Sequence, residues 1–178
     1  MRTMRLHGIN RDVFDRYSST KPGWHYDVVA PGYKYNLTDT AAAMGRVQLQ
    51  RAREMADRRA AIAAEFDRAF ADLPVTLPAH APEGSSHAWH LYVLRLDPGA
   101  PVARDRFIEL MAEREVGTSV HFIPLHLQPY WRDSYQHWPE DFPVATAEFA
   151  KAVSLPAFSA MTDDDVAQVI DAVRSILG

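Results

Sequence analysis

A proline-free amphipathic run between residues 38 and 73 constrains the fold more than any other feature of this sequence. Apolar side chains recur along it at intervals close to the helical period: Met44, Val47, Ala52, Met55, Ile62, Phe66 and Phe70. Thr38 or Asp39 can cap its start, and Pro74 interrupts the pattern at its end. The pattern therefore predicts one long amphipathic helix.

Short extended segments and helices alternate after Pro74. AWHLYVLRLD, residues 88–97, is rich in aromatic and branched side chains and predicts a strand. A helix is expected over residues 104–115, with Gly117 ending it. The segment from Thr118 then opens as a strand, which Pro124 turns into irregular structure.

The C-terminal third predicts two more helices. TAEFAKAVSLP, residues 146–156, indicates a short helix with an extended exit. In the last segment, Thr162 and Asp165 have the spacing of a capping box before a regular apolar period. The order of elements predicts an α+β layer with a small sheet.

The residues before the long helix have a different character. Residues 9–36 are rich in Tyr, Trp, Gly and Pro, which is typical of an ordered functional loop. Met1, Met4 and Arg5 precede Gly8, so this start resembles the tail of a helix with a glycine C-cap.

Composition excludes several classes of protein. A chain of 178 residues with net charge −4 has no general basic surface for nucleic acid. The absence of cysteine excludes a disulfide framework, a cysteine zinc site and a thiol nucleophile, and it fits the cytosol. The sequence has no apolar run long enough to span a membrane.

Asn36 lies two residues before the helix start, in the stretch APGYKYNLTDTAAAMG. Its amide and the free N–H groups of the first helical turn could hold an anion, above all a phosphate. Alternatively, Asn36 only shapes the turn while Tyr33 and Tyr35 pack beneath it. The spacing alone leaves both interpretations open.

The histidines offer a second candidate site. His121 and His126 could meet at a site edge and hydrogen-bond a sugar hydroxyl or move a proton. A metal site is disfavoured because no HExxH motif and no regularly spaced acid accompanies them. His90, inside the predicted strand, is expected to be a core or interface residue. PLHLQPYW is typical of a site-lining loop, although it could be a surface patch for a partner.

Four ordered segments together resemble one known family. They are GYKYNLTDTAAAMGRVQLQRA, HAWHLYVLRLD, REVGTSVHFIPLHLQPYW and SLPAFSAMTDDDVAQVIDAVRSIL, and they cover nearly the whole chain. The chain resembles the C-terminal half of the DegT/DnrJ/EryC1/StrS sugar aminotransferases. Within the family it is most similar to the UDP-4-amino-4-deoxy-L-arabinose–oxoglutarate aminotransferases, which implies a role in lipopolysaccharide biosynthesis.

The resemblance implies a fold and a domain organisation. It implies the small C-terminal α+β domain of an aspartate-aminotransferase-type (fold type I) enzyme, which uses pyridoxal 5'-phosphate. Residues 1–38 would be the end of the large domain and a cofactor loop that reaches across the dimer. Residues 39–73 would be the connecting helix, and residues 74–178 the small domain of a cytoplasmic homodimer.

The resemblance also implies roles for individual residues. The asparagine matching Asn36 binds the phosphate of the cofactor in the neighbouring subunit. Tyr33, His121, His126 and Tyr130 would lie on the side of the substrate, a keto sugar linked to a nucleotide that receives an amino group from glutamate. No metal ion and no nucleic acid is implied.

The lysines of the chain do not match the family's cofactor lysine. Lys21, Lys34 and Lys151 are the only lysines, and the family's lysine lies upstream of the position that matches Met1. The chain is therefore expected to be a fragment that is inactive alone and needs an upstream half. Two alternatives stay open: a related sugar dehydratase, in which histidine replaces that lysine, and a non-catalytic dimerisation or binding module.

Overall fold

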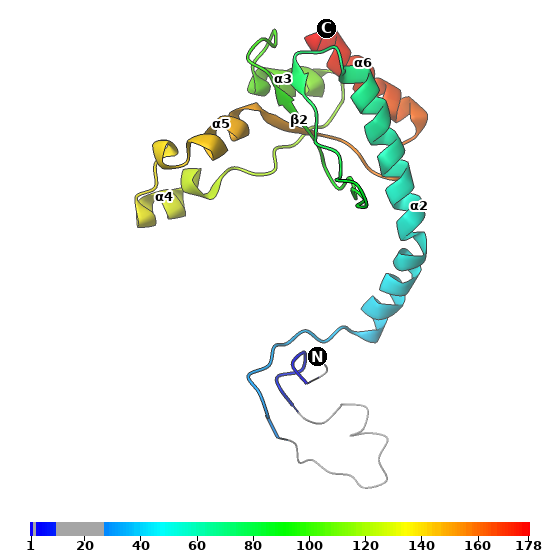
Figure 1. The fold of residues 1–178 in the computed structure, drawn as a ribbon, viewed down its shortest axis with the longest axis vertical. Coiled ribbons are helices and arrows are strands. Elements are labelled where there is room, and N and C mark those ends of the chain that lie inside the picture. The colour runs from blue at the N-terminus through cyan, green and yellow to red at the C-terminus, as the bar shows by residue number, and fades with distance from the viewer. Residues whose placement is uncertain (2, 10–26) are drawn as a thin grey trace. The chain divides into compact units, whose positions relative to one another are not determined.

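The computed structural model describes residues 1, 3–9 and 27–178. It forms two compact units, Met1–Arg51 and Ala52–Gly178. The boundary between them falls inside the long helix α2 (Asp39–Phe70), so this helix contributes residues to both units (Figure 1).

The first unit is held together by backbone hydrogen bonds between residues 3–9 and 28–35. His7 N donates to Tyr33 O at 3.0 Å, and Tyr33 N donates to Met4 O at 2.7 Å. Isolated bridges join Leu6 to Lys34 and Ile9 to Val28. The expected helix tail before Gly8 is reduced to turns in the described residues. Arg5 N still donates to Met1 O at 3.2 Å, but the carbonyl groups of Met4 and Arg5 pair with the distant segment.

Gly8 is required where these two segments meet. Its φ is +73°, and a Cβ added to it would lie 1.7 Å from the carbonyl oxygen of Ala30. Any other residue would therefore force the segments apart. Gly8 N also donates to Thr3 O at 3.0 Å, so Gly8 closes the turn before it as well as allowing this close approach.

Helix α2 confirms the prediction of one long amphipathic helix. Thr38 caps it, since its Oγ1 accepts a hydrogen bond from Ala41 N at 3.3 Å. Only the C-terminal part of the apolar stripe is buried, at Ile62, Phe66 and Phe70, together with Ala63. The N-terminal part is exposed, with Met44 at 67% and Val47 at 56%.

A small antiparallel sheet lies at the centre of the second unit. Its strands are β1 (Val75–Thr76), β2 (Tyr92–Leu96) and β3 (Ala152–Leu155), in the order β1-β2-β3. Alternate residues of β2 are buried, beginning with Tyr92. The predicted strand over 88–97 thus starts later than expected, because Trp89 has a φ of +46° that breaks the extended backbone.

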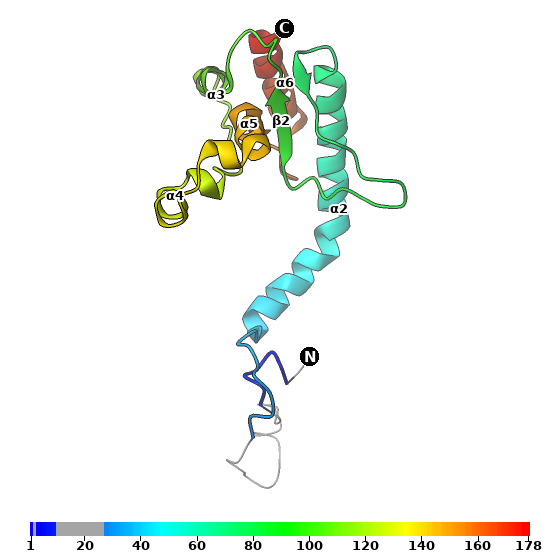
Figure 2. The same ribbon diagram turned by 60° about the vertical axis from the view of Figure 1, so that its left-hand side comes forward.

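Helices α3 (Arg104–Glu113), α5 (Pro143–Lys151) and α6 (Asp163–Leu177) confirm three predicted helices. Three short elements were not predicted: η1 (Leu125–Leu127), α4 (Pro129–Tyr135) and η2 (Pro139–Asp141). Both views show α4 away from β2 (Figure 1 and Figure 2).

The strand expected after Thr118 is largely absent. Only Ser119 pairs there, in an isolated bridge to Ser154 of β3. The chain then leaves the sheet edge and enters η1, which begins directly after Pro124. A proline at this point supplies no N–H for further pairing.

The core of the second unit packs around Tyr92, Phe66 and Phe70. The ring of Tyr92 is 5.1 Å from that of Phe66 in an edge-on contact. Phe107 and Met111 of α3 and Val166 and Val173 of α6 are also fully or almost fully buried. Helix, sheet and helix therefore share one apolar core.

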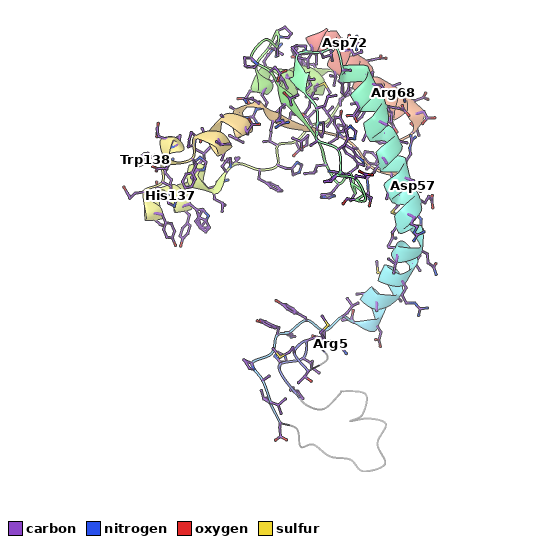
Figure 3. The ribbon with its side chains drawn as sticks, viewed as in Figure 1. Arg5, Asp57, Arg68, Asp72, His137 and Trp138 are labelled. Atoms are coloured by element: carbon purple, nitrogen blue, oxygen red, sulfur yellow. The ribbon has the colours of Figure 1, made fainter. Side chains whose placement is uncertain are left out.

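Two salt bridges join α2 and the turn that follows it to the α6 region. Arg58 Nη2 lies 2.8 Å from Asp163 Oδ1 at the start of α6. At the other end Arg174 Nη1 lies 2.8 Å from Asp72 Oδ1, and it also donates to Ala69 O. Figure 2 shows α6 beside the C-terminal part of α2, and Figure 3 labels Asp72 at the end of that part.

The predicted capping box at the start of α6 is confirmed. Thr162 N donates to Asp165 Oδ2 at 2.8 Å, and Asp165 N donates to Thr162 Oγ1 at 3.1 Å. The hydrogen bonds from the backbone and side chain of Thr162 hold the pKa of Asp165 below its ordinary value.

Acid therefore weakens this cap. Because the folded-state pKa is lowered, the stabilisation is present above the unfolded-state pKa of about 3.9 and is lost as pH falls through the folded value. We expect Asp165→Asn to lower stability at neutral pH and the difference from the wild type to vanish at strongly acidic pH. Denaturant unfolding monitored by circular dichroism from pH 7 downward measures this.

Asp171→Asn is the matched control, since this exposed α6 carboxylate has no hydrogen bond recorded within the described part of the chain. Its pH dependence should follow that of the wild type. A difference at Asp165 that stays constant down to strongly acidic pH would contradict the capping role.

Candidate cofactor and substrate site

Asn36 lies in the extended segment that leads into α2, and its side chain is exposed. Two residues later, Thr38 already satisfies Ala41 N through its hydroxyl and Ala42 N through its carbonyl oxygen. The carboxylate of Asp39 lies in the first turn of the helix. An anion bound here would therefore depend more on the Asn36 amide than on the positive end of the helix dipole, because the negative charge of Asp39 partly neutralises that end.

Tyr33 precedes Asn36 and forms a stacked pair with Tyr35. The ring centroids are 5.1 Å apart and the planes differ by 7°. The two rings are exposed at 57% and 72%, so the expectation that they pack beneath the turn is wrong. Within the first unit the two rings present an open aromatic surface, directly before Asn36 in the sequence.

His121 is exposed, in the segment that follows the bridge to β3. Its Nδ1 lies 2.9 Å from Oγ of Ser154, a buried residue of β3. The ring of Phe122 meets it edge-on, with centroids 4.8 Å apart. One ring nitrogen is thus held by the sheet, and Nε2 has no recorded partner among the described residues.

His126 is buried, with 6% of its surface exposed. Its Nε2 lies 2.9 Å from Thr146 Oγ1, and the Thr146 hydroxyl is 3.2 Å from Pro139 O. Because the single hydroxyl proton goes to the Pro139 carbonyl, the oxygen of Thr146 accepts from Nε2–H of His126. The ring also stacks on Phe142, at 4.7 Å.

His126 therefore joins η1, η2 and α5. We expect His126→Ala to destabilise this region by about 1–3 kcal/mol, because the variant loses a buried hydrogen bond and the ring contact. Hydrogen exchange followed by mass spectrometry should show faster exchange over residues 125–146 than in the wild type.

His90→Ala is the control for that experiment. His90 was expected in the core or an interface, but it is exposed and lies before β2. Exchange should not change in this variant. Unchanged exchange over residues 125–146 in His126→Ala would argue against the joining role.

Tyr130, at the start of α4, is 64% exposed. Its ring is 4.5 Å from that of Trp131, which together with Tyr135 and His137 lines a hollow of about 290 Å³. Figure 3 labels His137 and Trp138 in this aromatic region. This hollow is an aromatic surface that could hold a planar ring. That the segment lines a site stays a prediction.

The structure does not join the predicted site residues by direct contact. Within the described residues, no hydrogen bond or ring contact links His121, His126 and Tyr130 to one another. Asn36 and Tyr33 belong to the other unit. Ser154 and Thr146, which orient the two histidines, were missed because their sequence positions carry no signal of that role.

Pyridoxal phosphate in a transaminase is held covalently by a lysine. Lys34 is exposed next to the stacked tyrosines, and Lys151 pairs with Glu148 at 2.9 Å. Lys21 lies outside the described residues. The exposed Asn36 amide is a donor that fits an edge of the cofactor's phosphate.

Residues 1, 3–9 and 27–178 contain no cluster of three or more His, Asp or Glu side chains that could hold a metal ion. Over the same residues no helix has both the length and the apolarity needed to cross a membrane.

Comparison with known proteins decides the family. The model of the DegT/DnrJ/EryC1/StrS aminotransferase family matches residues 1–174. The chain belongs to this family. An uncharacterized protein of Methanocaldococcus jannaschii is 41% identical over 178 residues, and the spore coat polysaccharide biosynthesis protein SpsC of Bacillus subtilis is 42% identical over 179. The chain spans 46% of each relative's length and 99% of its own.

Solved structures of the family have the same fold as this chain. Spr1654 of Streptococcus pneumoniae, assigned as a sugar aminotransferase, superposes in its pyridoxamine-phosphate (PMP) form with a TM-score of 0.83 and 28% identity. The match covers 98% of this chain and 43% of Spr1654. TlmJ, an aminotransferase of Streptoalloteichus hindustanus, gives a TM-score of 0.75 and 27% identity. These matches confirm the predicted C-terminal fold type I architecture.

The cofactor class expected of the family is also confirmed. DegT/DnrJ/EryC1/StrS aminotransferases depend on pyridoxal phosphate, and Spr1654 is known in both its PLP and PMP forms. The narrower likeness to the UDP-4-amino-4-deoxy-L-arabinose–oxoglutarate aminotransferases stays a prediction, as do the individual site residues.

Proposed function

We propose that this chain provides the C-terminal part of a pyridoxal-phosphate-dependent nucleotide-sugar aminotransferase, which transfers an amino group from glutamate to a keto sugar nucleotide. The observation that supports it most strongly is the family match over residues 1–174. SpsC acts in the synthesis of a spore coat polysaccharide, so an amino sugar for a surface polysaccharide such as lipopolysaccharide is the corresponding product.

In this proposal each unit of the chain has its own task. The Asn36 amide of one subunit donates to the cofactor phosphate bound in the other, which makes the active assembly a homodimer. His121 and Tyr130 contact the nucleotide sugar, and Tyr33 adds aromatic surface beside it. Pyridoxal phosphate, when bound, supplies the electron sink that amino transfer requires.

A borohydride experiment tests whether the chain binds the cofactor covalently by itself. The purified chain is titrated with pyridoxal phosphate, reduced, and mapped by mass spectrometry. We expect no specific label at Lys21, Lys34 or Lys151. A specific label on Lys34 would contradict the proposal that the reactive lysine is supplied by another segment.

Activity is then measured after co-expression with the upstream half of a family member. Glutamate-dependent amination of a keto sugar nucleotide is the expected result. Loss of a sugar hydroxyl without amination would instead identify a dehydratase, and binding without any turnover would identify a non-catalytic module.

A further inference from the structure

We infer that Ser154 is a positioning residue, which holds the ring of His121 as the Nε2–H tautomer. His121 then presents a hydrogen-bond donor, and not a base, to an acceptor oxygen of the nucleotide sugar. The substrate part of this inference rests on the function proposed above. Its tautomer part rests only on contacts within the second unit.

Ser154 has little freedom to move. It is 4% exposed and belongs to β3, where it lies opposite Val93 of β2. On its other side, Ser154 N donates to Ser119 O at 2.7 Å, and Ser119 N donates to Ser154 O at 3.1 Å. The hydroxyl therefore stands on a strand that is paired on both edges at this residue.

The proton of the Ser154 hydroxyl decides the tautomer of His121. Nδ1 of His121, at 2.9 Å, is the partner recorded for Ser154 Oγ within the part of the chain described. If Nδ1 carried a proton and donated it, the hydroxyl proton would be left buried without an acceptor, at a cost of about 1–3 kcal/mol. Ser154 therefore donates to Nδ1, and the neutral ring carries its proton on Nε2.

His126 has the opposite arrangement. There Thr146 gives its proton to Pro139 O, so Nε2–H of His126 points inward and is already used. His126 is also buried against Phe142, whereas His121 is exposed. Of the two histidines, only His121 offers Nε2 to a ligand.

This geometry limits the chemistry open to His121. A neutral imidazole that carries its proton on Nε2 cannot take a second proton there as a general base. It can donate to a phosphate, carbonyl or hydroxyl oxygen. His121 is thus suited to binding the substrate, and the amino transfer step must obtain its base from another residue.

Nitrogen-15 NMR of the chain tests the tautomer directly. In the neutral form of the ring, we expect His121 to show a pyrrole-like Nε2 shift and a pyridine-like Nδ1 shift. Ser154→Ala should move both shifts toward the average of the two tautomers. Ser119→Ala, which keeps the bridge and removes an exposed hydroxyl, is the control and should leave them in place.

Kinetics of the assembled enzyme test the substrate role. Ser154→Ala should raise KM for the keto sugar nucleotide about 2- to 10-fold, because only part of the His121 rings then carry the proton on Nε2 and the ring is no longer held in place. The half-reaction with glutamate should keep its rate, because the nucleotide sugar takes no part in it. A general loss of structure would instead slow the reactions of both substrates. Ser119→Ala should change neither.

The NMR experiment and the kinetic experiment test different claims, so one claim can be contradicted without the other. A wild-type His121 that is protonated on Nδ1, or evenly divided between tautomers, overturns the inference whatever the enzyme does. An assembled protein with no amino transfer contradicts the proposed function, while the NMR result still decides the tautomer. A normal KM in Ser154→Ala, with the tautomer mixed, overturns the substrate role of the Nε2 donor.

Discussion

Replacing Phe66 with alanine should lower the free energy of unfolding by about 3–5 kcal/mol, the largest effect expected of any single change described here. Phe66 is fully buried on α2, with its ring 5.1 Å from Tyr92 of β2 and 5.5 Å from Phe70. The alanine would leave a cavity between the helix and the sheet, and the rigid neighbours would only partly fill it.

Urea unfolding followed by the circular dichroism of the helices measures this loss. Arg53→Ala, an exposed change on the same helix without a recorded partner in the described residues, should stay within about 0.5 kcal/mol of the wild type. A Phe66→Ala variant that loses less than about 1 kcal/mol would show that α2 does not form the core with β2.

Replacing Asn36 with alanine should weaken binding of pyridoxal phosphate by about 10- to 100-fold in the assembled enzyme. The amide donates to a charged phosphate oxygen in the proposed dimer, and such bonds contribute about 1.5–3 kcal/mol. Thr38 and Asp39 do not replace it, because Thr38 already caps α2 and Asp39 is negatively charged. Absorbance titration with the cofactor gives the dissociation constant.

Gln48→Ala is the matched control, since it removes an exposed amide from α2, the helix that follows Asn36. It should leave the dissociation constant unchanged. The alternative interpretation of Asn36, that it only shapes the turn, makes a different prediction: the Asn36→Ala variant would bind the cofactor normally and lose thermal stability. That pair of results would remove Asn36 from the proposed site.

The helices were the most predictable part of the fold. The long period of α2 and the capping-box spacing at Thr162 and Asp165 act over a few neighbouring residues, and the structure confirms both. The start of the chain was misjudged for the same reason. Gly8 has the positive φ of a helix cap and its N–H closes a turn on Thr3 O, but Tyr33 bonds to Met4 O and His7 N, and the described residues before Gly8 form no helix.

The candidate site was predictable in its members and not in its geometry. Residue type and the family resemblance named His121 and His126 as equivalent candidates on the substrate side. The structure makes them different, because one is exposed beside Ser154 and the other is buried beside Thr146. Burial depends on the packing of η1 and α5, which local patterns do not encode.

The sequence by itself determined the family, the cofactor class and the helices α2, α3, α5 and α6, because motif identity and apolar period are properties of neighbouring residues. The tertiary structure alone decided which histidine nitrogen faces outward. Ser154 lies 33 residues from His121, and Thr146 lies 20 from His126. A single hydroxyl proton has one best acceptor, and only the folded sheet and helices determine which acceptor lies within its reach.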